Sequence, residues 1–489
     1  MIFRNTAEFV IDFLNYRTEF LNRFASFSDI IKLQIQKEKI SMNLPLKFNY
    51  DYSECMVMKL GLAIPDKEHT NKSKVLMTFN EALDYIKKID NITQGITKIY
   101  YLVGWQYLGH DDKYPDFFEV NKALKRKEDK TAYDSFKWLS DEAKKYHSVI
   151  SVHINFNDAY DNAPSFDDFV KSGALIRKKN GKPNPIEKYN GRKCYKTCHK
   201  GYYESGLFKR QFDRFADTFP FIAESGTIHV DNFQCYKNYA PYVSIKEMQN
   251  ARRKMIEYVK SKGIDITSEF TYKESNTLAN KPIFGLPRDH FKSSPMDTVG
   301  LIPMSWWCYR MTDKELLETS PKIYCQGTFR EKTLNNIFYG NMHGEDIVKK
   351  DNADWVNDFI YAFATYQVPG HYLNSLKRVA IKGRGNTKFC EFSDGVVSYA
   401  KGRKITENGK IIKDGDTLFL PFVHEKSTYI AYSKNGDCRD WSVFEDDKTM
   451  ADVYKITENG NEFIREIPIN NNKLHINLPE KIGYKIILK

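Results

Sequence analysis

Residues 227–270 read TIHVDNFQCYKNYAPYVSIKEMQNARRKMIEYVKSKGIDITSEF, and the order of patterns within them decides the fold. A short apolar strand pattern comes first and ends at Asp231. A helix pattern follows, which begins with a capping box at Ser244 and ends at Gly263. A second strand pattern then ends at Glu269. A strand, a crossover helix and a strand predict two parallel neighbours in one sheet.

Two carboxylates therefore end neighbouring strands of the predicted sheet. Because parallel strands point their carboxyl ends the same way, we expect Asp231 and Glu269 side by side at one edge. Neighbouring strands lie about 4.8 Å apart, and retaining glycosidases hold their two carboxyl groups roughly 5–5.5 Å apart. Either acid alone could instead cap a helix or pair with a lysine. The pair favours a functional site, because two adjacent buried carboxylates repel each other.

The alternation of strand and helix patterns extends over residues 76–377. The strand patterns outside the opening stretch cover 96–105, 148–156, 301–307 and 323–328, and the helix patterns cover 78–89, 132–146, 205–219 and 354–376. Such alternation is typical of an α/β protein with a (β/α)8 barrel of the TIM type. We therefore expect residues 76–377 to form a catalytic barrel.

The pattern changes beyond residue 378. Short alternating strands are separated by Asn-Gly and Asp-Gly turns, which are hairpin signals. Residues 378–489 are therefore expected to form an all-β domain, a β-sandwich packed on the barrel. Residues 1–75 contain both a helix pattern and strand-like pieces, and we expect a short N-terminal extension of mixed structure.

Length and composition allow a large enzyme. The chain has 489 residues, enough for two or three domains, and 41% of them are hydrophobic and 14% aromatic. No run of eighteen apolar residues predicts a membrane span. The N-terminal residues lack the basic and apolar regions of a signal peptide. We expect a cytoplasmic protein, or a secreted one whose export signal has been removed.

Charge and cysteine content exclude other classes of function. The net charge is +11, but basic and acidic residues are interleaved, so we expect no nucleic-acid partner. Eight cysteines in so long a chain predict no disulfide framework and indicate a reducing compartment. Cys194, Cys198 and His199 form the one cluster that resembles a metal site, but its spacing is loose and free thiols are the better interpretation. We expect no metal and no cofactor.

Polar and aromatic side chains follow four of the predicted barrel strands, where loops build active sites. Carboxylates and imidazoles can bind paired sugar hydroxyls, while an aromatic ring covers the apolar side of the sugar. Structural alternatives exist, such as a turn at Asp111, a satisfied core group at His153 or simple packing at Trp306. The residues predicted here to bind substrate are Trp105, Gln106, His110, Asp111, His153, Asn155, Asn232 and Trp306.

Three motifs resemble the catalytic barrel of α-N-acetylgalactosaminidases. They are Gly104-Trp-Gln-x-x-Gly-His-Asp111, Val152-His-Ile-Asn155 with Asp158-Ala-Tyr160, and His229-Val-Asp231 with Ser268-Glu269. Two related families of glycoside hydrolases share this barrel. Endo-acting members remove a core-1 disaccharide from mucin Ser/Thr, and exo-acting members remove N-acetylgalactosamine. The resemblance covers residues 96–275 well and the rest of the barrel more loosely.

The resemblance implies a role for each acid, with Asp231 as the nucleophile and Glu269 as the general acid/base. The endo-acting family has a tryptophan-rich stretch where this chain has tyrosines at 195–203, and we add Tyr202 to the substrate-binding residues. This difference and the lack of an export signal favour an exo-acting enzyme. The residues implied to line the sugar pocket are His110, Asp111, His153 and Asn155.

Together, these patterns predict a retaining hydrolase of mucin-type O-glycans. Asp231 attacks the anomeric carbon, and Glu269 first protonates the leaving oxygen and then activates water. Two alternatives remain: a barrel hydrolase for another α-linked sugar, such as galactose, and a catalytically silent carbohydrate-binding protein. The expected partner is a carbohydrate or glycopeptide. The patterns leave the oligomeric state, the aglycone and the choice between endo and exo action open.

Overall fold

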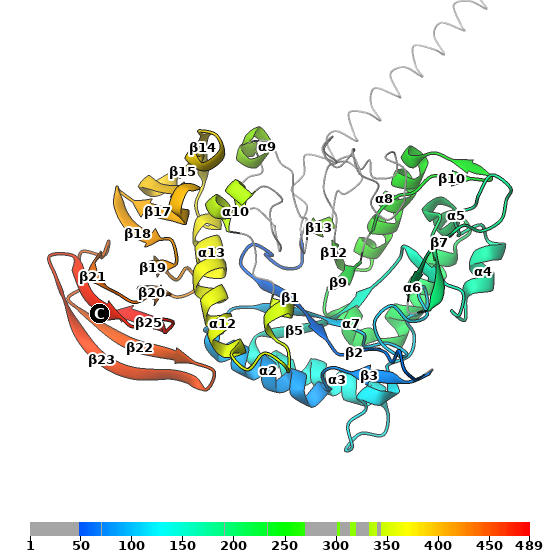
Figure 1. Ribbon diagram of the computed structural model, residues 1–489, viewed down its shortest axis with the longest axis horizontal. Coiled ribbons are helices and arrows are strands. Elements are labelled where there is room, and N and C mark those ends of the chain that lie inside the picture. Colours follow the sequence, from blue (N-terminus) through cyan, green and yellow to red (C-terminus); the bar gives the residue numbers. More distant parts are fainter. Residues whose placement is uncertain are drawn as a thin grey trace, which may run out of the picture. The chain divides into compact units, whose positions relative to one another are not determined.

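The computed structural model describes residues 48–69, 71–189, 191–231, 233–268, 301–303, 313–318, 332–339 and 344–489 (Figure 1). Two compact units divide the chain, 1–48 and 49–489, and the helices and strands below belong to the second. The helix expected near the N-terminus lies outside the described residues.

A parallel sheet forms the first layer of the fold. Within the described ranges it has six strands, and their spatial order is β1-β4-β5-β9-β12-β13. Each strand is parallel to its neighbours. The strands are β1 (Met56–Gly61), β4 (Lys98–Val103), β5 (Ser148–Ile154), β9 (Thr227–Val230), β12 (Asp265–Ser268) and β13 (Leu301–Pro303). The sheet thus takes its first strand from the segment assigned above to the N-terminal extension.

The opening stretch of sequence folds as predicted. Helix α8 (Ile245–Ser261) joins β9 to β12, and these two strands pair in parallel with Val230 opposite Ser268. The capping box is formed, since the amide of Ser244 donates to Glu247 Oε2 at 2.9 Å and the amide of Glu247 donates to Ser244 Oγ at 3.3 Å. These bonds satisfy backbone donors that the first helical turn leaves without partners.

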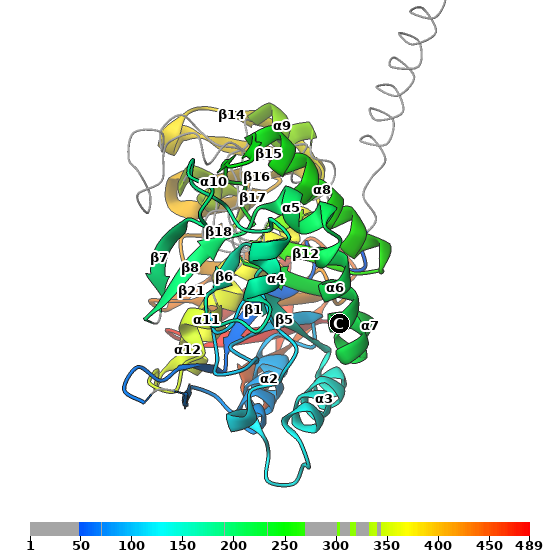
Figure 2. The same ribbon diagram turned by 90° about the vertical axis from the view of Figure 1, so that its right-hand side faces the viewer.

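Helices cover one face of the parallel sheet. In the views of Figures 1 and 2, α2 and α3 lie along the sheet, and the rings of Phe79 and Phe136 stack with centroids 5.6 Å apart. Ile150, Val152 and Ile228 from the strands are buried in the same apolar core. The described α-helices before β9 are α2 (Phe79–Ile92), α3 (Ala132–Ala143), α4 (Phe166–Lys171), α5 (His199–Glu204), α6 (Leu207–Thr218) and α7 (Pro220–Glu224).

The opposite face of the sheet carries polar side chains although it is buried. Strand pairing places Tyr101 beside Ser151, and His153 beside His229. The hydroxyls of Tyr101 and Thr227 lie 2.6 Å apart. Hydrogen bonds of this kind offset the cost of burying polar groups. We call this surface the polar face, and it consists of Tyr101, Ser151, His153, Thr227, His229, Asp265 and Thr267.

A small antiparallel sheet interrupts the alternation between β5 and α5. Its order is β6-β8-β7, from β6 (Asp158–Tyr160), β7 (Pro185–Tyr189) and β8 (Arg192–Lys196). The sequence patterns did not predict it, because its strands are short and lie in a segment without clear alternation. A second hairpin, β2 (Ala63–Pro65) with β3 (Ser73–Val75), follows β1.

The long helix predicted at 354–376 is present as three consecutive pieces. They are α12 (Trp355–Ala362), the π-helical turn η4 (Phe363–Gln367) and α13 (Val368–Asn374). Three shorter helices precede them, α9 (Asp313–Glu318), α10 (Lys332–Phe338) and α11 (Gly344–Ile347).

In the described part of the chain, no helix has the length and apolar character needed to cross a bilayer.

The C-terminal residues form one large antiparallel sheet, coloured orange to red in Figure 1. It has twelve strands, β14 to β25, between Arg378 and Leu488. The predicted hairpin turns are confirmed where Asn408 and Gly409, both with positive φ, join β17 (Lys404–Glu407) to β18 (Lys410–Asp414). The remaining strands are β14 (Arg378–Lys382), β15 (Phe389–Phe392), β16 (Val396–Tyr399), β19 (Thr417–Pro421), β20 (Thr428–Ser433), β21 (Asp437–Ser442), β22 (Met450–Thr457), β23 (Gly460–Asn470), β24 (Lys473–Leu478) and β25 (Gly483–Leu488).

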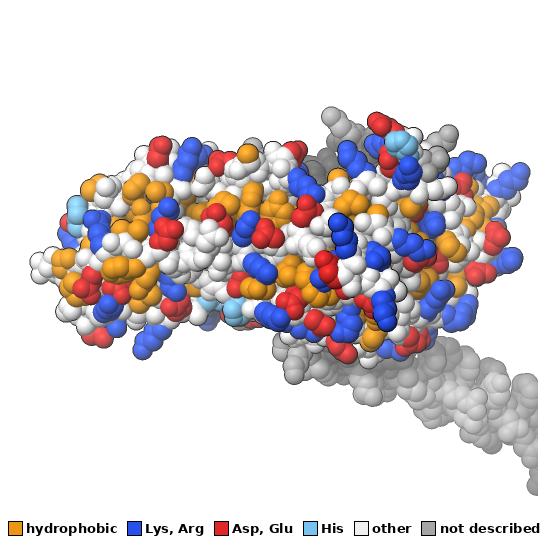
Figure 3. Space-filling model, turned by 90° about the horizontal axis from the view of Figure 1, so that it is seen from below, with side chains coloured by type: hydrophobic (Ala, Val, Ile, Leu, Met, Phe, Trp, Pro, Cys, Tyr) orange, Lys and Arg blue, Asp and Glu red, His pale blue; other side chains and the backbone are white. Residues whose placement is uncertain are grey.

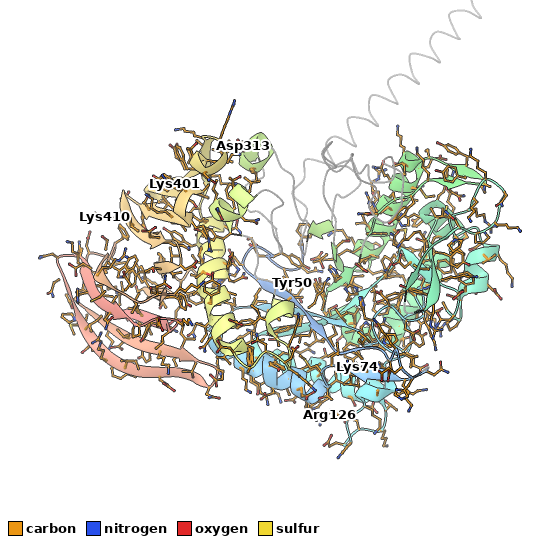
Figure 4. The ribbon with its side chains drawn as sticks, in the orientation of Figure 1. Tyr50, Lys74, Arg126, Asp313, Lys401 and Lys410 are labelled. Atoms are coloured by element: carbon orange, nitrogen blue, oxygen red, sulfur yellow. The ribbon has the colours of Figure 1, made fainter. Side chains whose placement is uncertain are left out.

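Polar contacts join this sheet to the helices that precede it. Asp313 of α9, labelled in Figure 4, forms an ion pair of 2.7 Å with Lys388 before β15. The side chain of Asn91 in α2 donates to the carbonyl oxygen of Glu458 at 2.9 Å. On the face of the molecule in Figure 3, basic and acidic side chains are interspersed, as the sequence predicts for a solvated surface.

Candidate active site

Asp231 is the first residue after β9, at the carboxyl edge of the parallel sheet. Its backbone amide donates to the carbonyl oxygen of Ile154 at 2.8 Å, which extends the pairing of β5 and β9 by one residue. Its side chain is 20% exposed, so the carboxylate is accessible but largely surrounded by protein. This position is the one where α/β barrels place catalytic groups.

Asn155 holds the carboxylate of Asp231. The Asn155 amide nitrogen lies 3.3 Å from Asp231 Oδ2 and 3.1 Å from Asp158 Oδ2. Its amide oxygen accepts from the backbone amides of Asn157 at 2.7 Å and Asp158 at 2.9 Å. Because the oxygen accepts from two N–H groups, the amide has one orientation and its nitrogen must point to the two carboxylates. The side chain of Asn155, which the sequence predicts at this site, therefore has one fixed orientation beside Asp231.

His153 lies next to Asp231 but remains neutral. Its Nε2 atom is 3.8 Å from Asp231 Oδ2, too far for a hydrogen bond. Burial, together with the charges of Lys59, His229 and His110, lowers its pKa well below the usual range. Neither ring nitrogen has a hydrogen-bond partner among the described residues. A neutral imidazole of this kind can donate to one hydroxyl and accept from another.

Three imidazoles lie in a row beside Asp231. The ring of His153 is 5.2 Å from that of His110 and 5.1 Å from that of His229, measured between centroids. His229 Nδ1 lies 2.8 Å from the hydroxyl of Thr267 on β12. The row runs from the loop after β4 across β5 to β9, so it brings together residues from three neighbouring strands.

The loop after β4 carries His110 and Asp111, and two glycines fit it against β2. Gly104 and Gly109 have positive φ, and a Cβ atom at either position would overlap the carbonyl group of Ala63. The amide of His110 donates to that same carbonyl oxygen at 2.9 Å. His110 Nε2 lies 3.2 Å from Asp111 Oδ2. The predicted pair is therefore brought to the site on a loop that is fixed by backbone contacts.

Tyr114 is a site residue that the sequence analysis missed. Its side chain is fully buried, and its hydroxyl lies 3.5 Å from the carbonyl oxygen of His153. Burial and the nearby charges of Asp111 and Asp231 raise its pKa well above the usual range, so it stays protonated. The signal that could have found it is its place three residues after the Gly-His-Asp motif.

Three of the predicted substrate-binding residues lie in packed surroundings. Trp105 is fully buried against Phe136 and Phe219, and its indole nitrogen donates to the carbonyl oxygen of His153 at 3.2 Å. Gln106 is also fully buried, and its amide nitrogen donates within the loop to Gly109 at 3.3 Å. Tyr202 is buried with its hydroxyl bonded to Gln211. Their rings and amide are packed in the interior of the protein.

Other predicted residues fall outside the part of the chain that the structure describes. They are Glu269, Asn232 and Trp306.

The cysteine cluster does not form a metal site within the described residues. There, no group of three or more His, Cys, Asp or Glu side chains is arranged to hold a metal ion. Neither Cys194 nor Cys198 takes part in a disulfide bond in the described part of the chain. His199 Nε2 bonds instead to Asn157 Oδ1 at 3.0 Å, and burial and the charge of Arg252 lower its pKa to about 3.

A cavity of about 520 Å³ lies on the outer side of the loop after β4. Tyr107 and Leu108 of the loop line it together with the β2–β3 hairpin, whereas His110 and Asp111 do not. None of His110, His153, Asn155 and Asp231 lines this cavity.

Comparison with known proteins bears on this cluster. Residues 42–281 match the family model described as endo-α-N-acetylgalactosaminidase, and this segment contains all three motifs identified in the sequence. Among solved structures, the ligand-free α-N-acetylgalactosaminidase NagBb from Bifidobacterium bifidum shares 14% identity over 72% of this chain and 58% of that chain, with a TM-score of 0.49. The α-amylase from Geobacillus thermoleovorans shares 10% identity over 90% of this chain and 99% of that chain, with a TM-score of 0.44.

This chain spans little more than half the length of NagBb, 58% of it. The family match covers the residues from β1 through β12, including His110, His153, Asn155 and Asp231. It therefore confirms that the chain resembles glycoside hydrolases of the endo- and exo-α-N-acetylgalactosaminidase type.

Proposed function

We propose that the protein is a retaining glycoside hydrolase that cleaves α-linked N-acetylgalactosamine from Ser/Thr glycopeptides. The observation that supports this most is the placement of Asp231, which ends β9 inside the segment that matches the family and is held by Asn155. The neighbouring imidazoles and Asp111 supply the donors and acceptors that a sugar ring with several hydroxyls requires.

In the proposed reaction, a carboxylate oxygen of Asp231 bonds to the anomeric carbon while the bond from that carbon to the Ser/Thr oxygen breaks. Glu269 gives its proton to the departing oxygen. Water then attacks the anomeric carbon of the glycosyl ester, Glu269 takes a proton from that water, and Asp231 leaves as a carboxylate. Glu269 has this role because it directly follows Ser268, whose strand β12 pairs with β9.

The proposal extends to the architecture. We propose that the parallel strands close into a (β/α)8 barrel around the polar face, within residues up to 377. Residues 378–489 would form a separate sandwich-like domain with a structural role. We favour removal of single N-acetylgalactosamine residues over removal of a disaccharide, because tyrosines at 195–203 occupy the place of the tryptophans expected in an endo-acting enzyme.

Product analysis tests this proposal. The protein is incubated with glycopeptides that carry a single N-acetylgalactosamine or a core-1 disaccharide, and NMR follows the anomeric proton of the released sugar. We expect N-acetylgalactosamine to appear first as the α-anomer, because two displacements retain configuration. Initial release of the β-anomer, or faster cleavage of an α-galactoside than of the α-N-acetylgalactosaminide, would contradict the proposal.

A further inference from the structure

A chain of polar contacts connects the small antiparallel sheet to Asp231. Lys196 on β8 lies directly opposite Asp158 on β6, and its Nζ atom is 2.5 Å from Asp158 Oδ1. The other oxygen of Asp158 accepts from the amide nitrogen of Asn155 at 3.1 Å. The same nitrogen reaches Asp231 at 3.3 Å. Asp158 and Asn155 thus link the cation of Lys196 to the proposed nucleophile.

This ion pair is buried. The side chain of Lys196 is 6% exposed and that of Asp158 is 12% exposed. Burial alone would lower the pKa of Lys196, but the adjacent charge of Asp158 outweighs it and raises that pKa well above the usual range. Lys196 therefore remains charged. Buried ion pairs contribute little net stability compared with an apolar pair of the same size, so their presence calls for another reason.

We propose that Lys196 is a positioning residue for the nucleophile, which balances the charge of Asp158 so that one Asn155 amide can serve two carboxylates. The inference rests on the proposed function and adds a residue from a different strand to it.

The electrostatic surroundings of Asp231 explain why this balance matters. His153 beside it is neutral, as its pKa is far below the usual range. Tyr114 nearby is a protonated phenol, and the charges of Asp111 and Asp158 act on the same hydroxyl. Lys59, on β1, lies close enough for its charge to act on His153. Without Lys196, the uncompensated carboxylate of Asp158 would share one amide with Asp231, and a like charge disfavours ionisation of its neighbour.

The pH dependence of kcat/KM separates this role from a merely structural one. The acid limb of the profile reports ionisation of the nucleophile in the free enzyme. We expect Lys196→Met to move that limb up by about one pH unit, which corresponds to roughly tenfold lower kcat/KM on its acid side. Lys196→Arg, which keeps the charge, should leave the limb within a few tenths of a unit.

A double variant removes the charge without leaving its partner unpaired. In Lys196→Met with Asp158→Asn, both charges are absent, and the acid limb should return towards its wild-type position. Lys193→Met on the same strand is the matched control, because Lys193 is exposed and should leave the profile unchanged. Thermal unfolding of each variant checks that the protein is folded, and Lys196→Gln, which also removes the charge, takes the place of Lys196→Met if that variant does not fold.

The measurements use p-nitrophenyl α-N-acetylgalactosaminide from pH 4 to 8. An acid limb that stays in place in the folded single variant, or one displaced equally in the single and double variants, overturns the role of Lys196. A wild-type protein that hydrolyses none of the α-glycosides overturns the proposed function and this inference with it.

Discussion

The two large sheets of this molecule bury different kinds of side chain. The parallel sheet has a polar face, where Tyr101, Thr227 and His229 depend on one another or on Thr267 for hydrogen bonds. The C-terminal sheet buries a continuous apolar cluster in which the ring of Phe419 stacks on that of Tyr429 at 4.5 Å. Burial of apolar area stabilises a fold, whereas buried polar groups add little beyond offsetting their own desolvation. The comparison teaches that the parallel sheet keeps one buried face for polar groups, whereas the C-terminal sheet buries an apolar cluster that contributes stability.

The largest expected effect is a loss of activity when Asp231, beside the polar face of the parallel sheet, is replaced. Asp231→Asn should lower kcat roughly 10⁴-fold on p-nitrophenyl α-N-acetylgalactosaminide, because the amide cannot act as the nucleophile. The melting temperature should stay close to that of the wild type, since asparagine has the same shape and Asp231 is partly exposed. The exposed Asp161→Asn serves as the control. Full activity in Asp231→Asn would remove this residue from the proposed mechanism.

The C-terminal sheet should respond in the opposite way. Leu474 on β24 is fully buried in the apolar cluster, so Leu474→Ala should lower the free energy of unfolding by about 3 kcal/mol through lost burial and a new cavity. The kcat of the folded variant should not change. Chemical denaturation and steady-state kinetics measure the two quantities. Ile464→Ala at a half-exposed position of β23 should cost much less, and a strong loss of kcat in Leu474→Ala would show that the sheet takes part in catalysis.

The smallest effect concerns pH. His153 is neutral in the folded protein because its pKa lies well below the value of 6.5 expected in an unfolded chain. The unfolded chain therefore binds a proton that the folded protein does not, and stability present above pH 6.5 is lost as the pH falls. Between pH 6.5 and pH 5 the loss amounts to about 2 kcal/mol for one such histidine.

Replacing this histidine should remove that part of the pH dependence. The free energy of unfolding of His153→Gln, measured with denaturant, should change less between pH 7 and pH 5 than that of the wild type. His475→Gln is the control in the C-terminal sheet, where the side chain is 69% exposed, and it should leave the difference unchanged. If both variants keep the wild-type difference, the polar face does not hold a neutral His153.

The elements that the sequence predicted correctly are those with local signals. The unit from β9 to β12 was predictable because the capping box at Ser244, the helical spacing in α8 and the two short apolar strands all lie within one stretch. The C-terminal hairpins were predictable for the same reason, since Asn408 and Gly409 adopt the positive φ that such turns require.

The details of the site depend on contacts between distant residues, and no local pattern contains them. Trp105 comes shortly after strand β4 as a sugar-binding residue would, but Phe136 and Phe219 enclose it. Tyr202 is likewise buried, and its hydroxyl is hydrogen-bonded to Gln211. The sequence predicted Asn155 at the pocket, yet its orientation comes from the turn to Asp158.

The contact of Gly104 and Gly109 with Ala63 has a consequence for how this protein can diversify. A loop that allows no side chain at two positions, and whose His110 amide is bonded to the neighbouring strand, can change little in length or sequence without displacing the histidine. Among the described residues, the outer strand of the inserted sheet of β6, β7 and β8 is β7, which pairs with β8 alone. We therefore expect changes of sequence in the insert to be tolerated more readily than changes in the loop after β4. A new substrate preference would arise in the insert.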